Sequence, residues 1–303
     1  MLPLKDSHIN EYLKYKRSFR LSPLTHLKTN IELDLFMRYL RSKNIDSINV
    51  VDEKVVRQYL SSARKTKFWL TRRVRSFVTI AYKRVLLWNY FEYLCQMQFR
   101  ADNPVRSIPT PLLPKKVPEF LSLRQAVKLL KFVVKNKKKP HQYQIRGRAY
   151  IALILFYGLE NHEIFRIKLK DLDFKQKTMK IRKTHFHDSR TFPLFPPVDK
   201  WLLAYKRIRP IRRSDRFFQN VKTSSDCGFM TTRGYLQVLS RKMRLKLSSK
   251  ILRSTFFSFM YDGNVNHRVI QAIIGCHTIE TIERRSVIAS SRKKAAVETL
   301  STI

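Results

Sequence analysis

Glycine and acidic residues are the scarce components of this 303-residue sequence. It contains 6 Gly, and 22 Asp and Glu against 62 Lys and Arg, which gives a formal net charge of +40 at pH 7. A chain so short of acid repels itself unless a polyanion supplies counter-charge, so nucleic acid is the first candidate partner and an acidic membrane surface the second. A disordered basic tail is disfavoured, because hydrophobic residues make up 44% of the chain and can form a core.

Long apolar runs and paired cysteines are also missing. No stretch of about 18 apolar residues occurs and the first residues do not resemble a signal peptide, so we expect no membrane segment and no secretion signal. Cys95, Cys227 and Cys276 lie far apart and match no CxxC or zinc spacing, which favours reduced thiols in a cytoplasmic protein. His185 and His187 have no third ligand in view, so we interpret them as a solvated loop and expect no metal and no cofactor.

The length suggests two domains, and the first, residues 1–104, has the apolar spacing of helices. Apolar residues recur at this spacing in Ile31, Leu35, Phe36 and Leu40, and again in Val56, Tyr59 and Leu60. A longer aromatic helix follows, whose expected core-facing stripe is Phe77, Ile80, Ala81, Val85, Trp88, Phe91 and Leu94.

Proline then interrupts the helical pattern. Asn103-Pro104 is followed by Pro109, Pro111, Pro114 and Pro118. Because proline removes a backbone donor and restricts the residue before it, this stretch cannot be helical. We expect an extended linker over residues 105–118 and a second domain over residues 119–303.

The second domain reads as mainly helical with one small sheet. Ser122 and Gln125 form a candidate capping box, and the helix that it begins should point Val127, Leu130, Val133 and Val134 inward. Residues 149–157 are apolar on all sides and predict a central helix that ends at Gly158. Alternating residues at 178–182 and 190–194 predict a two-stranded hairpin. The fold class is therefore α+β, mainly α.

Basic residues gather in three tracts that contain no acid: ten Lys or Arg in 54–90, nine in 120–159 and seven in 227–261. Single lysines often only solvate a helix face, but stretches without acid favour contact with a polyanion. The tracts lie in both domains, so we expect the two domains to form a clamp around double-stranded DNA. The candidate DNA-binding residues are Arg64, Lys65, Lys67, Arg72, Arg73, Arg75, Arg241, Lys242 and Arg244.

Four segments match one family in the right order. Residues 158–164 (GLENHEI) with 170–173 (KDLD) resemble the "GLRxSEL…L…DID" box of tyrosine recombinases, the phage integrase family. Residues 180–194 resemble the family's "IxGKGxKxRxVPL" hairpin, 252–256 (LRSTF) its "LRHTFAT" and 268–275 (RVIQAIIG) its "RVIQELLGH". The N-terminal half is similar to the family's helical, SAM-like core-binding domain. The resemblance covers nearly the whole chain and is closest to the Xer type in length.

The resemblance implies a defined chemistry. In this family a tyrosine attacks a DNA phosphodiester to give a 3′-phosphotyrosyl intermediate. Two arginines stabilise the charge on the phosphate, and a lysine of the hairpin protonates the leaving 5′ oxygen. Two further groups, usually His and His or Trp, assist proton transfer and positioning.

Carried over position by position, the resemblance retains two of these groups and replaces four. The retained ones are Lys183 and Arg253. Glu160 stands in place of the first arginine, Lys250 in place of a histidine, Cys276 in place of the His or Trp, and Arg285 in place of the nucleophilic tyrosine. No tyrosine occurs after Tyr261. A carboxylate at 160 would repel the phosphate. A desolvated glutamate without a partner is costly, so we expect Glu160 to pair with Arg253 or Arg285; the alternative is a solvated Glu160 in an open cleft.

Three hypotheses follow from these substitutions. The leading one is a catalytically inactive recombinase homologue that still binds DNA. The second is a working recombinase with a relocated hydroxyl nucleophile, such as Ser254, Thr281 or Ser286, or with a nucleophile supplied in trans by an active paralogue. The third is a regulator that docks residues 290–303 on an active recombinase. Partners besides DNA would accordingly be further copies of this chain or an active paralogue.

Overall fold

The protein is described from a computed structural model. Residues 4, 7–19, 21, 23–65, 76–110, 118–135, 142–184, 187–210, 214–220 and 229–275 are described. The chain divides into two compact units, Met1–Lys115 and Lys116–Ile303. Within the described ranges, no helix is long and apolar enough to cross a membrane.

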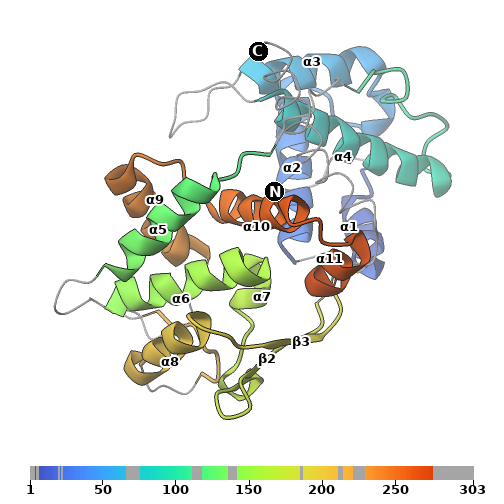
Figure 1. The fold of residues 1–303 in the computed structure, drawn as a ribbon. Helices are drawn as coiled ribbons and strands as arrows, with labels where there is room; N and C mark the ends of the chain where they lie inside the picture. The colour runs from blue at the N-terminus through green and yellow to red at the C-terminus, as the bar shows by residue number, and fades with distance from the viewer. Residues whose placement is uncertain are drawn as a thin grey trace. The chain divides into compact units, whose positions relative to one another are not determined.

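The first unit is helical (Figure 1). Its elements are α1 (Ile9–Ser18), α2 (Pro23–Ser42), a 3-10 turn (Ile48–Val50), α3 (Glu53–Lys65) and α4 (Phe77–Gln96). Leu33, Phe36 and Leu40 of α2 pack into one core with α3 and α4. The expected inward positions Val56, Tyr59 and Leu60 of α3 are buried there as well.

The expected stripe on α4 is partly wrong. Ile80, Ala81, Phe91 and Leu94 are buried. Three other members of the stripe are exposed, namely Phe77, Val85 and Trp88. The helix carries apolar residues around most of its circumference, so spacing alone does not choose the face that meets α2 and α3. On α2, Ile31 is exposed for the same reason.

The start of the predicted linker packs against the first unit. Val105 and Ile108 are buried in the core of the first unit, and residues 104–107 form a turn. Arg84 of α4 donates from Nε to the Ile108 carbonyl at 2.6 Å and so holds this segment against the helix. Of the predicted linker, 111–117 lies outside the described residues.

The second unit surrounds one helix with others and adds a small sheet (Figure 1). Its helices are α5 (Leu123–Val134), α6 (Gln142–Tyr157), α7 (Asn161–Ile164), a 3-10 turn (Leu169–Asp171), α8 (Val198–Ile208), α9 (Phe229–Met243), α10 (Ser249–Asp262) and α11 (His267–Ile274). Its strands are β1 (Leu172–Asp173), β2 (Thr178–Ile181) and β3 (Arg190–Pro193). This mainly helical architecture with a small sheet confirms the predicted fold class.

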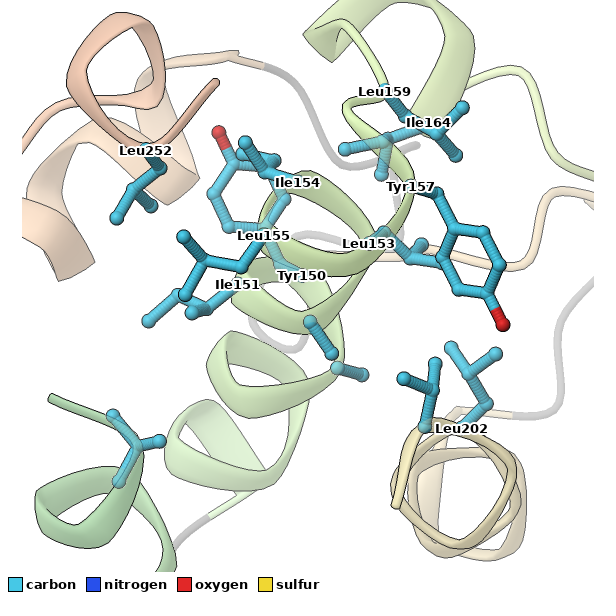
Figure 2. Close-up of a cluster of buried hydrophobic side chains, with 14 of the residues drawn as sticks. Tyr150, Ile151, Leu153, Ile154, Leu155, Tyr157, Leu159, Ile164, Leu202 and Leu252 are labelled. Atoms are coloured by element: carbon cyan, nitrogen blue, oxygen red, sulfur yellow. The ribbon is translucent and has the colours of Figure 1, made fainter. Parts of the chain in front are cut away.

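The central helix is α6, as its apolar sequence predicts. Nearly every side chain from Ala149 to Tyr157 is buried. Figure 2 shows Ile151, Leu153 and Ile154 projecting in different directions from α6, with Leu252 of α10 and Leu202 of α8 on opposite sides. The helix therefore fixes where α8 and α10 lie in this unit.

The sheet is antiparallel in the order β1-β2-β3. Met179 of β2 pairs with Leu172 on one side and Phe192 on the other, and all three side chains are buried. Lys180, one residue along, is exposed and pairs with Thr191. The predicted hairpin is thus confirmed, and it is extended by a short first strand.

The capping box on α5 is also confirmed. Ser122 accepts from the Gln125 backbone, and the Gln125 side chain accepts from the Ser122 backbone. The predicted inward face of α5 is wrong at Val127 and Val134, which are exposed, whereas Val133 is buried. The buried stripe also contains Ala126 and Leu129. As on α4, apolar residues lie on two faces of the helix, so their spacing does not decide which face is buried.

Candidate functional site

An open cavity of about 380 Å³ lies in the second unit where α7 meets α10. Its walls carry several of the polar groups that the sequence singled out. The lining includes Glu160, Asn161, His162, Ser249, Lys250 and Arg253. Residues almost a hundred positions apart in the sequence thus meet at one surface.

Glu160 reaches the cavity because α6 ends abruptly. Gly158 has φ of +63°, a conformation that side chains with a Cβ rarely adopt. A Cβ there would also lie 2.5 Å from ring atoms of Phe256 on α10. The chain then turns into α7, and the Glu160 backbone N–H donates to Glu163 Oε2 at 2.8 Å. Glu160 is therefore held at the N-terminal end of α7 by its own backbone.

Arg253 of α10 forms an ion pair with Glu160, between its Nη1 and Glu160 Oε1. Its Nε also donates to the Gly158 carbonyl at 2.8 Å. The Arg253 side chain is 11% exposed and that of Glu160 is 32% exposed. A guanidinium that is largely buried against a carboxylate has part of its donor set already occupied, so a phosphate oxygen must compete with Glu160 for it.

His162 lies on the other side of the same carboxylate. Its Nδ1 is 3.2 Å from Glu160 Oε2. Burial lowers the pKa of His162, the positive charges of Arg166 and Arg190 lower it further, and Glu163 raises it. The imidazole is therefore held in its neutral form more strongly than a free histidine.

A buried acid lies behind His162. Glu163 Oε1 is 2.8 Å from Arg190 Nη2 and 3.4 Å from His187 Nδ1. The His187 ring stacks on the ring of His162, with centroids 5.7 Å apart. His187 is 6% exposed, so the predicted solvated loop is wrong at this residue. His187 packs here against Glu163 and against the ring of His162, two contacts that the polar appearance of the loop does not reveal; His185 lies outside the described residues.

An amide links α7 to α10 across the cavity wall. Asn161 accepts a hydrogen bond from Tyr150 Oη at 2.6 Å and its Nδ2 donates to Ser249 Oγ at 3.1 Å. Because Tyr150 is fully buried on α6, this relay fixes α7 to the central helix and sets the spacing between Glu160 and Arg253.

The comparisons with known proteins bear directly on this region. A family model described as "Phage integrase family" matches residues 119–285, which are more than half of the 303-residue chain. The chain belongs to the phage integrase family. The cavity between α7 and α10 lies within the matched residues.

Relatives match over almost the full length of the chain. A tyrosine recombinase of Pseudothermotoga lettingae is 25% identical and covers 97% of this chain and 96% of its own length. The tyrosine recombinase XerC of Syntrophus aciditrophicus is also 25% identical, with the same coverage of 97% and 96%.

Solved structures share the fold at lower identity. The Tn1549 transposon integrase in complex with a circular intermediate DNA gives a TM-score of 0.72 at 14% identity, covering 97% of this chain and 100% of that one. The XerH site-specific recombinase bound to a palindromic difH substrate gives a TM-score of 0.72 at 18% identity, covering 97% and 84%.

The structure brings together three of the six positions that resemble the catalytic groups of the phage integrase family. Glu160, Lys250 and Arg253 line one cavity, and Lys250 is exposed in it. Lys183 is not among the lining residues; it follows β2 and its exposed Nζ lies 3.3 Å from Asp188. Cys276 and Arg285 lie outside the described residues.

The expected DNA-binding residues are described only in part. Arg64 and Lys65 are exposed at the end of α3, and the Arg64 guanidinium lies 4.0 Å from the ring centroid of Phe77. Lys67, Arg72, Arg73 and Arg75 lie outside the described residues. The remaining three expected residues, Arg241, Lys242 and Arg244, are exposed at the C-terminal end of α9.

Sequence reasoning missed His162 and Asn161. Asn161 stands at the unspecified position of the "GLRxSEL"-like box and His162 at its Ser, and the family pattern assigns neither position a catalytic role. A useful signal was present: a histidine two residues from a carboxylate in a short polar turn can contact it directly. The expected pairing of Glu160 with Arg253 is present in the structure.

Proposed function

We propose that this phage integrase family member binds double-stranded DNA and does not cut it with its own active site. The observation that carries the proposal is the ion pair between Glu160 and Arg253. Where the family pattern has two arginines that stabilise a phosphate, this chain has an acid that neutralises the one arginine retained. Loss of one such donor slows catalysis by about 100- to 1,000-fold, and here the donor's charge is reversed.

The missing nucleophile supports the same conclusion. The position that resembles the family's tyrosine is Arg285, and the sequence has no tyrosine after Tyr261. Without a phenolic oxygen near the phosphate, the covalent intermediate of the family mechanism cannot form. Lys183 and Arg253 then serve as phosphate contacts.

Binding to DNA is supported by charge and by the relatives. The chain carries +40 at pH 7, and its acid-free tracts lie in both units. The structural relatives with the same fold include the Tn1549 integrase and XerH, both solved with DNA. The exposed basic ends of α3 and α9 provide donors for phosphate oxygens.

A salt titration on one labelled duplex tests binding and cleavage together. A footprint of on the order of ten phosphates makes affinity fall with roughly that power of the salt concentration. The expected result is a retarded complex at low salt that weakens steeply toward physiological salt and releases uncut strands. Affinity that stays flat over this range contradicts the binding, and cut strands contradict the inactivity.

A further inference from the structure

The two oxygens of Glu160 face two different side chains, one that is cationic and one that can become cationic. Oε1 contacts Arg253, which carries a permanent charge, and Oε2 lies 3.2 Å from Nδ1 of His162, which can gain one. All three side chains line the same open cavity. The carboxylate therefore has a second partner within reach if it releases the first.

A phosphate that enters this cavity is repelled by the carboxylate of Glu160. It brings a negative charge next to Glu160, while the charge of Arg253 is already balanced by that acid. Two anions in a partly buried site repel unless a further positive charge arrives. Imidazole is the side chain that gains a proton nearest to neutral pH, whereas a carboxyl group ordinarily does so about two pH units lower.

We propose that His162 is a positioning residue that couples phosphate binding in this cavity to the uptake of one proton. The protonated imidazole then pairs with the carboxylate of Glu160, and Arg253 turns its Nη1 donor from that carboxylate to a non-bridging phosphate oxygen. The proposal rests on the proposed binding of DNA and adds to it a pH-dependent exchange of partners at Glu160.

The surroundings of His162 set the direction of the effect. Burial, Arg166 and Arg190 lower its pKa and Glu163 raises it, so the free protein near pH 7 keeps it neutral. The charged and titratable groups that face this region are Glu160, Glu163 and Arg166 from α7 and its ends, His187 and Arg190 from the hairpin, and Lys250 and Arg253 from α10.

A bound phosphate raises the pKa of His162 above its value in the free protein, because it favours the charged form. The gain in affinity is then present below the bound-state pKa and is lost as pH rises through it. Below the lower pKa of the free protein the gain no longer grows, because His162 is protonated before DNA binds.

The test is the affinity for a fluorescein-labelled random-sequence duplex, measured by anisotropy between about pH 5.5 and about pH 8 at constant ionic strength. One coupled proton changes affinity by at most about tenfold per pH unit. Between about pH 8 and about pH 5.5, the affinity of the wild type should increase about three- to tenfold more than the affinity of His162→Gln does. His267→Gln, which removes an exposed histidine on α11, should keep the wild-type slope.

Glu160→Gln provides an independent test of the same proposal. It removes the charge that holds Arg253, so it should bind more tightly than wild type near pH 8 and show the shallow slope of His162→Gln. Equal slopes in wild type and His162→Gln, with tight binding in both, overturn the proton coupling and leave DNA binding intact. Failure of the wild type to bind duplex at any pH instead overturns the proposed function.

Discussion

At the scale of the residue, Gly158 is the position on which the geometry of the cavity depends. Its φ of +63° ends α6, and a Cβ would lie 2.5 Å from the Phe256 ring. Gly158→Ala should lower the free energy of unfolding by about 1–3 kcal/mol, since both the left-handed backbone and the contact are strained. Thermal or urea unfolding measures this loss.

Gly234 gives a matched control for that substitution. It lies inside α9, and a Cβ built there meets nothing within 4 Å. Gly234→Ala should raise the free energy of unfolding by about 0.5–1 kcal/mol, because alanine loses less conformational entropy in a helix. Equal destabilisation by the two variants would show that Gly158 has no special role.

Restoring the family's catalytic groups one at a time gives a second prediction at this scale. Arg285→Tyr alone should give no strand cleavage, because Glu160 still repels the phosphate and occupies Arg253. Glu160→Arg combined with Arg285→Tyr is the smallest change expected to give any, and Lys250→His is the next to add. Cleaved strands are scored on a denaturing gel; cleavage by Arg285→Tyr alone would mean that Glu160 is no obstacle.

At the scale of the element, the hairpin and α11 are tied together. Arg190 at the start of β3 donates from Nε to the Ile273 carbonyl at 2.6 Å, and the Asp188 N–H donates to the Gly275 carbonyl at 2.9 Å. Arg190 is also the partner of the buried Glu163. One side chain thus joins β3, α7 and the end of α11.

Removing the contacts of Arg190 should increase local opening of α11 without unfolding the second unit. Arg190→Gln should increase amide hydrogen exchange in residues 267–275 and around Glu163, because the helix end loses its anchor and the acid loses its charge partner. Lys180→Gln, an exposed neighbour on β2, should leave exchange unchanged. Exchange mass spectrometry that shows no difference between the two variants would contradict the anchoring role.

How far the sequence predicts these elements depends on how unambiguous each local signal is. The capping box of Ser122 and the hairpin strands depend on local backbone chemistry, and both are as predicted. The buried faces of α4 and α5 are set by neighbouring helices. Because both helices carry apolar residues on several sides, Val85 and Val127 were wrongly predicted to face the core. His187 is buried next to Glu163, a contact between segments that no local pattern reveals.

At the scale of the whole molecule, the charge distribution predicts that the second unit contributes to DNA affinity. Replacing Arg241 and Lys242 of α9 by Gln should weaken binding to all sequences alike and reduce the salt dependence, since each lost phosphate contact removes about one unit of slope. The matched control replaces Lys175 and Lys177, two exposed bases of the β1–β2 turn outside the acid-free tracts. An equal loss in both variants would mean that only net charge matters.

The predicted clamp requires that both units contact the same duplex. The basic tract of the first unit includes Arg64 and Lys65, exposed at the end of α3, and its replacement should weaken binding as the α9 pair does. In the proposed function, the molecule holds DNA through two basic surfaces, and the position of the family's first arginine carries an acid, Glu160.

The most direct test of that account is covalent trapping. The unmodified protein is incubated with a nicked duplex of the sequence that it binds best, denatured, and examined for a protein–DNA adduct, with an active tyrosine recombinase on its own site as the positive control. The account predicts a retarded native complex and no adduct after denaturation. An adduct formed by the unmodified protein would contradict it, because some nucleophile of this chain would then attack the phosphate despite Glu160 and Arg285.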